Sequence, residues 1–196
     1  MKNRVTAWIL GGFILGATLL SHGQPGSDPA SAIDTARSVL TVRVYKTGLF
    51  SAFAHDHEVR APIQKGAVDE EKNTVGFTVD ARALRVLDPQ VSEKDRADIQ
   101  SAMLGPKVLD SEKFPEIRFR STSVGESGDD NWTVRGDLTL HGQTHQVKVD
   151  VAGRDGHYVG SARLSQKDFG ITPISIAGGS IKVKDEVLVE FEIFAK

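Results

Sequence analysis

The alternation of apolar and polar residues with a period of two restricts the fold of this chain more than any other feature. Because successive side chains of a β-strand point to opposite faces, such a segment predicts a strand with one buried face. Three further segments, 49–60, 63–70 and 157–165, show a weaker form of the pattern. The clear alternation is found at residues 40–44, 75–79, 117–119, 132–140, 147–151 and 187–193.

Short segments rich in Asn, Asp and Gly separate these strands, at residues 72–73, 125–131, 141–143 and 154–156. Such residues close tight hairpins, and hairpins join antiparallel neighbours. An antiparallel sheet with this many strands usually curls or closes on itself. The pattern therefore predicts an all-β fold, a single antiparallel β-barrel of about eight strands.

One segment departs from the strand pattern. Ser92 is a suitable helix N-cap, an acidic residue follows it three positions later, and Ile99 and Met103 continue at helical spacing. Gly105 and the proline after it would end the helix. We predict one short helix over residues 92–104, placed at the flank of the barrel.

The N-terminal residues are typical of a secretory signal peptide. Lys2 and Arg4 precede an uncharged, mostly apolar stretch over residues 8–20, which is shorter than the roughly 20 residues of a membrane-spanning helix. We predict a signal peptide at 1–23, a flexible tether at 24–32 and the barrel domain at 33–196. An uncleaved anchor is the alternative. The processed protein would be periplasmic or secreted and not an integral membrane protein.

Composition excludes several classes of function. The chain has no cysteine, which excludes thiol catalysis, cysteine metal sites and a lipid-bearing N-terminal cysteine. Its formal net charge of −2 gives no basis for nucleic-acid binding. His55 and Asp56 would project to opposite sides of a strand, and no nucleophile elbow, zinc-protease helix or phosphate-binding loop is present. We expect no enzymatic activity and no cofactor.

Four strings, in order along the chain, resemble the YceI-like family. They occupy residues 108–121, 136–144, 164–171 and 183–187, and the resemblance extends over 33–196. It implies a lipocalin-like antiparallel β-barrel, exported to the bacterial periplasm, whose interior in similar proteins holds a polyisoprenoid or another long amphiphile. This chain departs from many relatives at residues 48–58, where a different His-containing segment stands.

Residues on the inward face of the strands are the candidates for binding a long-chain isoprenoid or fatty amphiphile. Apolar area alone can hold such a ligand, at about 25 cal/mol per Å² buried. For each residue the alternative is ordinary core packing. The candidates are Leu49, Phe53, His55, His57, Phe77, Phe119, Trp132 and Phe191.

His55 and His57 would share one face of a strand because they are two positions apart. They could contact the polar end of a ligand or make structural hydrogen bonds. They could also bind zinc or copper, with His141, His145 or His157 as further ligands. The alternative to a lipid carrier is therefore a periplasmic divalent-metal-binding or stress-response protein. An interaction module without a ligand is the third hypothesis, and the sequence leaves a homodimer open.

Overall fold

The structure, a computed structural model, describes residues 30–48, 56–176 and 181–196. In these parts the chain forms one α-helix and a twelve-stranded sheet, whose strands pair in antiparallel fashion. The strands are β1 (Ser31–Ala32), β2 (Val39–Thr47), β3 (His57–Ala61), β4 (Ile63–Asp69), β5 (Thr74–Asp80), β6 (Arg85–Val86), β7 (Glu116–Gly128), β8 (Asn131–Leu140), β9 (Gln143–Arg154), β10 (His157–Ser165), β11 (Ser175–Ile176) and β12 (Ile181–Phe194); α1 is Glu93–Leu104, and two 3₁₀ turns, η2 and η3, are Ala81–Ala83 and Gln166–Phe169.

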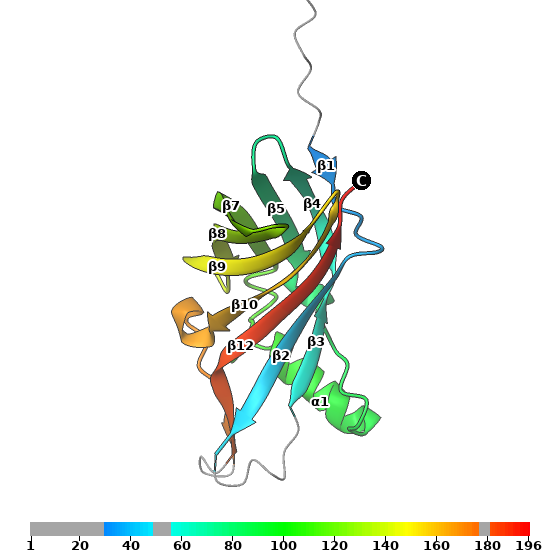
Figure 1. Cartoon of the computed structure of the whole chain (residues 1–196). Helices are drawn as coiled ribbons and strands as arrows, with labels where there is room; N and C mark the ends of the chain where they lie inside the picture. Colours follow the sequence, from blue (N-terminus) through cyan, green and yellow to red (C-terminus); the bar gives the residue numbers. More distant parts are fainter. Residues whose placement is uncertain (1–29, 49–55, 177–180) are drawn as a thin grey trace, which may run out of the picture.

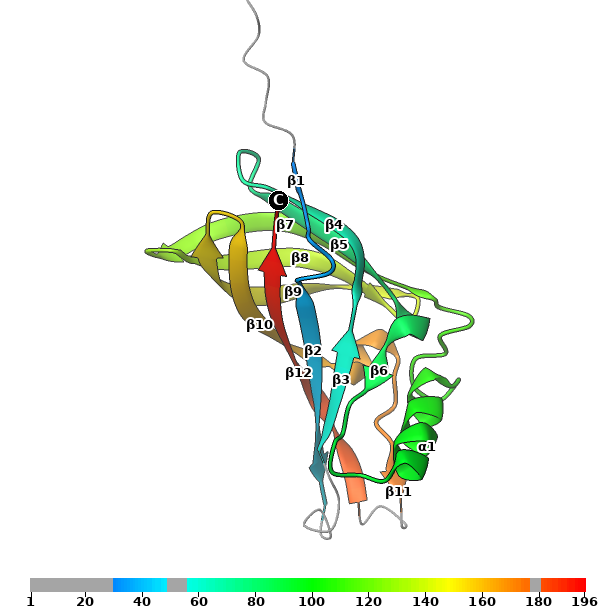
Figure 2. The same ribbon diagram turned by 90° about the vertical axis from the view of Figure 1, so that its right-hand side faces the viewer.

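The sheet curls into a barrel that returns to its start through one bent segment (Figure 1). β3 pairs with β2, and after Pro62 the chain continues as β4, which pairs with β5. β3 and β4, each the second strand from one end of the strand order, are thereby consecutive along the chain. At one end of the barrel, β1 pairs with β4, and Ile33 forms a bridge with Ala195 just beyond β12 (Figure 2).

The structure confirms the predicted all-β antiparallel barrel with one flanking helix, but it contains twelve strands rather than about eight. Three of the additional strands, β1, β6 and β11, have two residues each and carry no readable alternation. β3 and β4 correspond to the two separately predicted segments 49–60 and 63–70, and Pro62, which has no backbone N–H, stands between them. The long strands of the barrel wall are the predicted ones.

The hairpins turn where Asn, Asp and Gly predicted them. His141 and Gly142 have φ values of 50° and 73° between β8 and β9, and Asp155 and Gly156 have values of 52° and 77° between β9 and β10. Positive φ at both central residues is the geometry of the type I′ turn, whose twist matches paired strands. Local sequence therefore determines these two connections.

The predicted helix is also confirmed. The hydroxyl of Ser92 caps its first turn by accepting a hydrogen bond from the amide of Asp95 at 3.1 Å, and Gly105 ends it. The helix lies near β6, at the end of the barrel opposite the C-terminus (Figure 2). Its apolar residues Ile99 and Met103 are only partly buried against the core.

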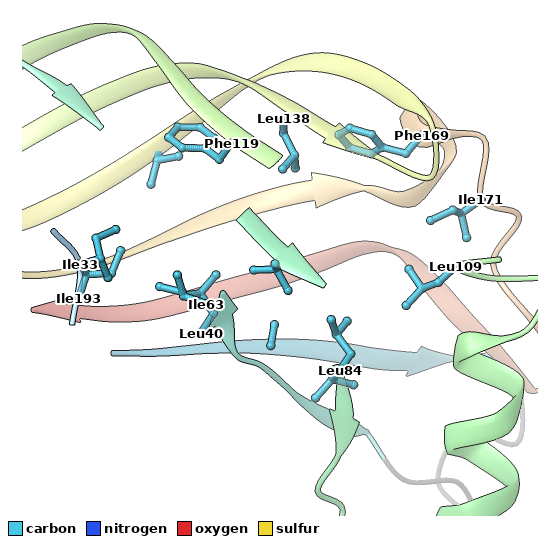
Figure 3. Packing of buried hydrophobic residues seen from close by; sticks show 14 of the residues in the cluster. Ile33, Leu40, Ile63, Leu84, Leu109, Phe119, Leu138, Phe169, Ile171 and Ile193 are labelled. Atoms are coloured by element: carbon cyan, nitrogen blue, oxygen red, sulfur yellow. The ribbon is translucent and has the colours of Figure 1, made fainter. Parts of the chain in front are cut away.

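The hydrophobic core fills part of the barrel interior, where side chains of different strands meet (Figure 3). Val79, Phe119 and Ile193 are buried, with 2%, 5% and 5% of their surfaces exposed. These residues come from β5, β7 and β12, so the core joins strands that are distant in the sequence.

The predicted signal peptide, 1–23, and residues 24–29 of the predicted tether lie outside the described residues. Ser31 and Ala32, the last residues of that tether, form β1, because their backbones pair with β4. No helix among the described residues has the length and apolar character needed to cross a bilayer.

Candidate functional site

A cavity of about 420 Å³ lies inside the barrel. The inward residues of β2, β3, β4, β5, β7, β8, β9, β10 and β12 contribute to its wall, together with Met103 of α1. Valine, leucine, isoleucine and phenylalanine supply most of this wall. The cavity is therefore a largely apolar space, of the kind that suits an apolar guest.

Four of the aromatic residues predicted as ligand contacts, Phe77, Phe119, Trp132 and Phe191, line this cavity. The rings of Phe77 and Phe119 are in contact, with their centroids 5.5 Å apart and their planes tilted by 31°. The indole Nε1 of Trp132 donates a hydrogen bond to the carbonyl oxygen of Gly153 at 3.1 Å. Because its only polar atom is bonded to the wall, Trp132 can present its apolar ring to a guest.

Two glycines allow aromatic rings to lie close to the barrel wall. A Cβ at Gly136 would lie 2.5 Å from Cε2 and Cζ of Phe119, and a Cβ at Gly160 would lie 2.5 Å from Cζ of Phe191. Any larger residue would displace these rings, because real Cβ atoms do not come so close to other atoms. The glycines thus let both rings pack against the wall of the cavity.

A tyrosine and a glutamate meet at one end of the cavity. The hydroxyl of Tyr158, on β10, donates a short hydrogen bond to the carboxylate of Glu70 in the β4–β5 turn. Burial, and then this hydrogen bond, raise the pKa of Tyr158 to about 12. Both residues line the cavity, so this end combines an apolar interior with a polar rim.

His57 points to the interior side of β3, as the alternation predicts, but it is not among the residues that line the cavity. Its Nδ1 lies 2.6 Å from Oδ2 of Asp88, a carboxylate with only 1% of its surface exposed. The other carboxylate oxygen of Asp88 accepts a hydrogen bond from the amide of Glu58 at 2.8 Å. In the described part of the chain, His57 therefore contributes to attaching the segment after β6 to the edge of β3.

The three histidines considered as further metal ligands contact other groups in the structure. Nδ1 of His141 lies 3.0 Å from the carbonyl oxygen of Phe169, and the ring of His145 contacts the Phe169 ring edge-on. Nε2 of His157 lies 2.9 Å from Oε1 of Glu192. Across the described residues, no group of three or more His, Cys, Asp or Glu side chains is arranged to hold a metal.

Leu49, Phe53 and His55, the remaining predicted site residues, lie outside the described residues. Tyr158 and Met103 line the cavity but were not among the predicted contacts. Tyr158 shares the inward face of β10 with Ala162, so alternation carried the signal for it. Nothing in the local sequence indicates that Met103, on a helix, contacts the same cavity.

Known proteins resemble this chain in both sequence and fold. A UPF0312 protein of Vibrio cholerae is 35% identical over 128 residues, which cover 60% of this chain and 62% of that protein. A UPF0312 protein of Vibrio parahaemolyticus is 31% identical over 153 residues, 73% of this chain and 72% of that protein. The Vibrio cholerae match thus spans less than two thirds of its relative.

The crystal structure of BcnA from Burkholderia cenocepacia has the same fold, with a TM-score of 0.59 and 19% identity. The match covers 84% of this chain and 99% of that one. A family model for the YceI-like domain matches residues 32–195, which is most of the sequence and nearly the entire barrel. The protein therefore belongs to the YceI-like family.

Proposed function

We propose that this protein is an exported carrier that holds a long-chain isoprenoid or fatty amphiphile inside its barrel and does not change it chemically. The apolar cavity of about 420 Å³ is the observation that carries the proposal. Membership of the YceI-like family supports it, because the family resemblance implies an elongated interior that holds such molecules.

The apolar cavity wall explains how a carrier of this kind would gain affinity. Burying apolar surface contributes about 25 cal/mol per Å², and the contribution depends on area rather than on directed contacts. The rings of Phe77, Phe119, Trp132 and Phe191 supply large apolar faces at little entropic cost. A flexible hydrocarbon chain could therefore bind along the cavity through many small contacts.

Export is part of this proposal and depends on residues 1–23, whose positive start and short apolar stretch are typical of a signal peptide. A periplasmic or secreted location suits a carrier of lipids, which need a protein to cross an aqueous compartment. The mass of the protein purified from a bacterial host tests this point, since cleavage would remove the N-terminal segment.

The metal-binding alternative gains no support from the described residues. His57 is hydrogen-bonded to Asp88, while His55 lies outside the described part. The third hypothesis, an interaction module with a filled interior, is disfavoured by the cavity. We therefore retain the carrier as the proposed function.

Native mass spectrometry of the protein, purified without detergent from the periplasm of a bacterial host, tests the carrier directly. We expect an additional bound mass in stoichiometric amount, which organic extraction after denaturation identifies as a long-chain amphiphile. A bound zinc or copper ion that is lost in the His57→Ala variant would instead support the metal alternative. A protein without bound mass, which also fails to bind added farnesol, would contradict the carrier.

Two variants on β10 test whether the bound lipid lies in the cavity. Ala162 lines the cavity, whereas Val159 lies on the outer face with 41% of its surface exposed. Ala162→Phe places an aromatic ring in the space that the guest needs, so we expect it to lose most of the bound lipid. Val159→Phe is the matched control and should keep it. Equal lipid content in both variants would place the lipid outside the barrel.

A further inference from the structure

The polar side chains that line the cavity are concentrated at one end. They come from the β4–β5 turn and from the β9–β10 turn with the start of β10, and they include Glu70, Asn73 and Tyr158. At the end near α1, the lining from the described residues includes Leu84, Met103 and Leu109, with Gln166 as a polar member. An amphiphile in this cavity would therefore find polar partners mainly at the β4–β5 end.

Most charges at this polar end already have a partner of opposite sign. Lys72 donates hydrogen bonds to both carboxylate oxygens of Asp69, at 2.7 Å from Nζ and 2.9 Å from the amide. Arg154 lies within ion-pair distance of Asp130 and Asp155, at 3.4 and 3.7 Å. The hydrogen bond of Lys72 lowers the pKa of Asp69. These groups therefore offer little net charge to a ligand.

Glu70 differs from its neighbours. Among the described residues Glu70 forms no ion pair with a lysine, arginine or histidine, and its carboxylate accepts a hydrogen bond from the hydroxyl of Tyr158. A carboxylate has several acceptor sites, so one hydrogen bond from a phenol leaves capacity for another donor. Glu70 thus provides an uncompensated negative charge and an acceptor at the rim of an apolar cavity.

This rim lies far from His57. Val187 of β12 pairs with Val44 of β2, which in turn pairs with His57 of β3. Ile193, six positions further along β12, pairs with Tyr158 of β10. Six residues of a strand span about 20 Å at about 3.3 Å per residue. The Tyr158–Glu70 pair and His57 therefore belong to different ends of the barrel.

We propose that Tyr158 and Glu70 bind the polar end of the cargo and select a neutral or cationic head group over an anionic one. This inference rests on the proposed carrier function and narrows its ligand class. A hydroxyl, amide or ammonium group can donate a hydrogen bond to Glu70 or to the phenol oxygen of Tyr158, whose own proton is already donated to Glu70. A fully ionised phosphate or carboxylate has no proton to donate to Glu70, and its negative charge is repelled by that of Glu70.

Matched amphiphiles test the selection, because they share one tail and differ only in the head group. Farnesol, farnesylamine and farnesyl phosphate are titrated, below their aggregation concentrations, against protein expressed from the full sequence and stripped of lipid. Displacement of a fluorescent fatty probe gives each dissociation constant. For the unmodified protein we expect farnesol and farnesylamine to bind about fivefold more tightly than farnesyl phosphate, a modest factor because the rim is solvated.

Glu70→Gln removes the charge and keeps an oxygen that accepts the hydrogen bond of Tyr158. We expect this variant to bind farnesyl phosphate about fivefold more tightly and farnesylamine more weakly than the unmodified protein, with the affinity for farnesol nearly unchanged. Glu71→Gln makes the same charge change at the next position, outside the cavity lining, and should alter each constant less than twofold. Tyr158→Phe should weaken the binding of farnesol.

Three outcomes would overturn this assignment. Equal affinities for the three compounds would contradict the selection while leaving the carrier intact. An effect of Glu71→Gln as large as that of Glu70→Gln would show a general field effect rather than a contact. If none of the compounds binds and purified protein carries no lipid, the carrier and the head-group assignment are contradicted together.

Discussion

Nδ1 of His57 lies 2.6 Å from Oδ2 of Asp88, a carboxylate with 1% of its surface exposed, and this contact joins β3 to the segment after β6. The amide of Glu58 donates to the other oxygen of the same carboxylate. A buried carboxylate is tolerated only when its oxygens have hydrogen-bond partners. His57 therefore supplies one of the two partners that Asp88 requires.

The first prediction concerns this contact. We expect His57→Ala to lower the free energy of unfolding by about 1–3 kcal/mol, because one oxygen of Asp88 loses its partner. His157→Ala, which removes a half-exposed contact with Glu192, should cost less than about 1 kcal/mol. Urea unfolding measures both values. If a chelator destabilises the unmodified protein and has no effect on His57→Ala, the histidine binds a metal instead.

The second prediction concerns the glycine under the Phe119 ring. We expect Gly136→Ala to cost about 1–3 kcal/mol of stability and to weaken lipid binding, because the added methyl group drives the ring into the cavity. Gly125→Ala is a matched control on β7, since its Cβ would meet only the carbonyl oxygen of Thr133, at 3.9 Å. Chemical unfolding and lipid titration of both variants test this prediction. Equal changes in stability and lipid affinity would mean that the β-propensity of alanine, and not contact with the Phe119 ring, causes them.

The third prediction concerns how α1 is held. The side-chain amide of Gln100 accepts from the amide of Val86 at 2.8 Å and donates to the carbonyl oxygen of Leu84 at 2.9 Å, so it pairs with β6 as another strand would. We expect Gln100→Ala to speed hydrogen exchange of the α1 amides about tenfold and to leave β8 and β9 unchanged.

The control for this prediction is Lys94→Ala, which removes an exposed ion pair with Asp98 on the same helix. Such pairs contribute about 0.3–0.5 kcal/mol, so exchange should change little. Exchange that is equally fast in both variants would show that Gln100 does not hold the helix to β6.

The fourth prediction concerns alkaline pH. Burial and the hydrogen bond to Glu70 raise the pKa of Tyr158 from 10.0 to about 12, so the folded protein holds this proton more tightly than the unfolded chain. The stabilisation is therefore complete below about pH 10 and is lost as the pH rises to about 12. The free energy of unfolding of the unmodified protein should therefore fall more steeply over this pH range than that of Tyr158→Phe. Parallel curves would contradict the raised pKa.

Local sequence was sufficient to predict the long strands, their hairpins and the helix. Val187 to Ile193 alternate in a run of seven residues, and Asp155–Gly156 adopt the positive φ that their types favour. The cap of Ser92 is likewise a contact between residues three positions apart. Each of these features depends on neighbours in the chain, which is why the sequence reveals them.

The contacts across the barrel could not be predicted in this way. Tyr158 and Glu70 are 88 positions apart, and their hydrogen bond depends on how two turns meet when the barrel forms. The same holds for Met103, which reaches the cavity only because α1 lies against the end of the barrel. For His57 the sequence predicted the face of the strand but not Asp88 as the partner.

The order of residues is enough to establish which side chains of each strand point inward, because side-chain direction in a strand follows from position alone. It also determined where the chain turns, through residues that tolerate positive φ. The tertiary structure alone decided which inward residues pack together and which surround a cavity, and which polar groups meet at its rim. These outcomes depend on the curvature and closure of the whole sheet, which bring together side chains that no local pattern relates.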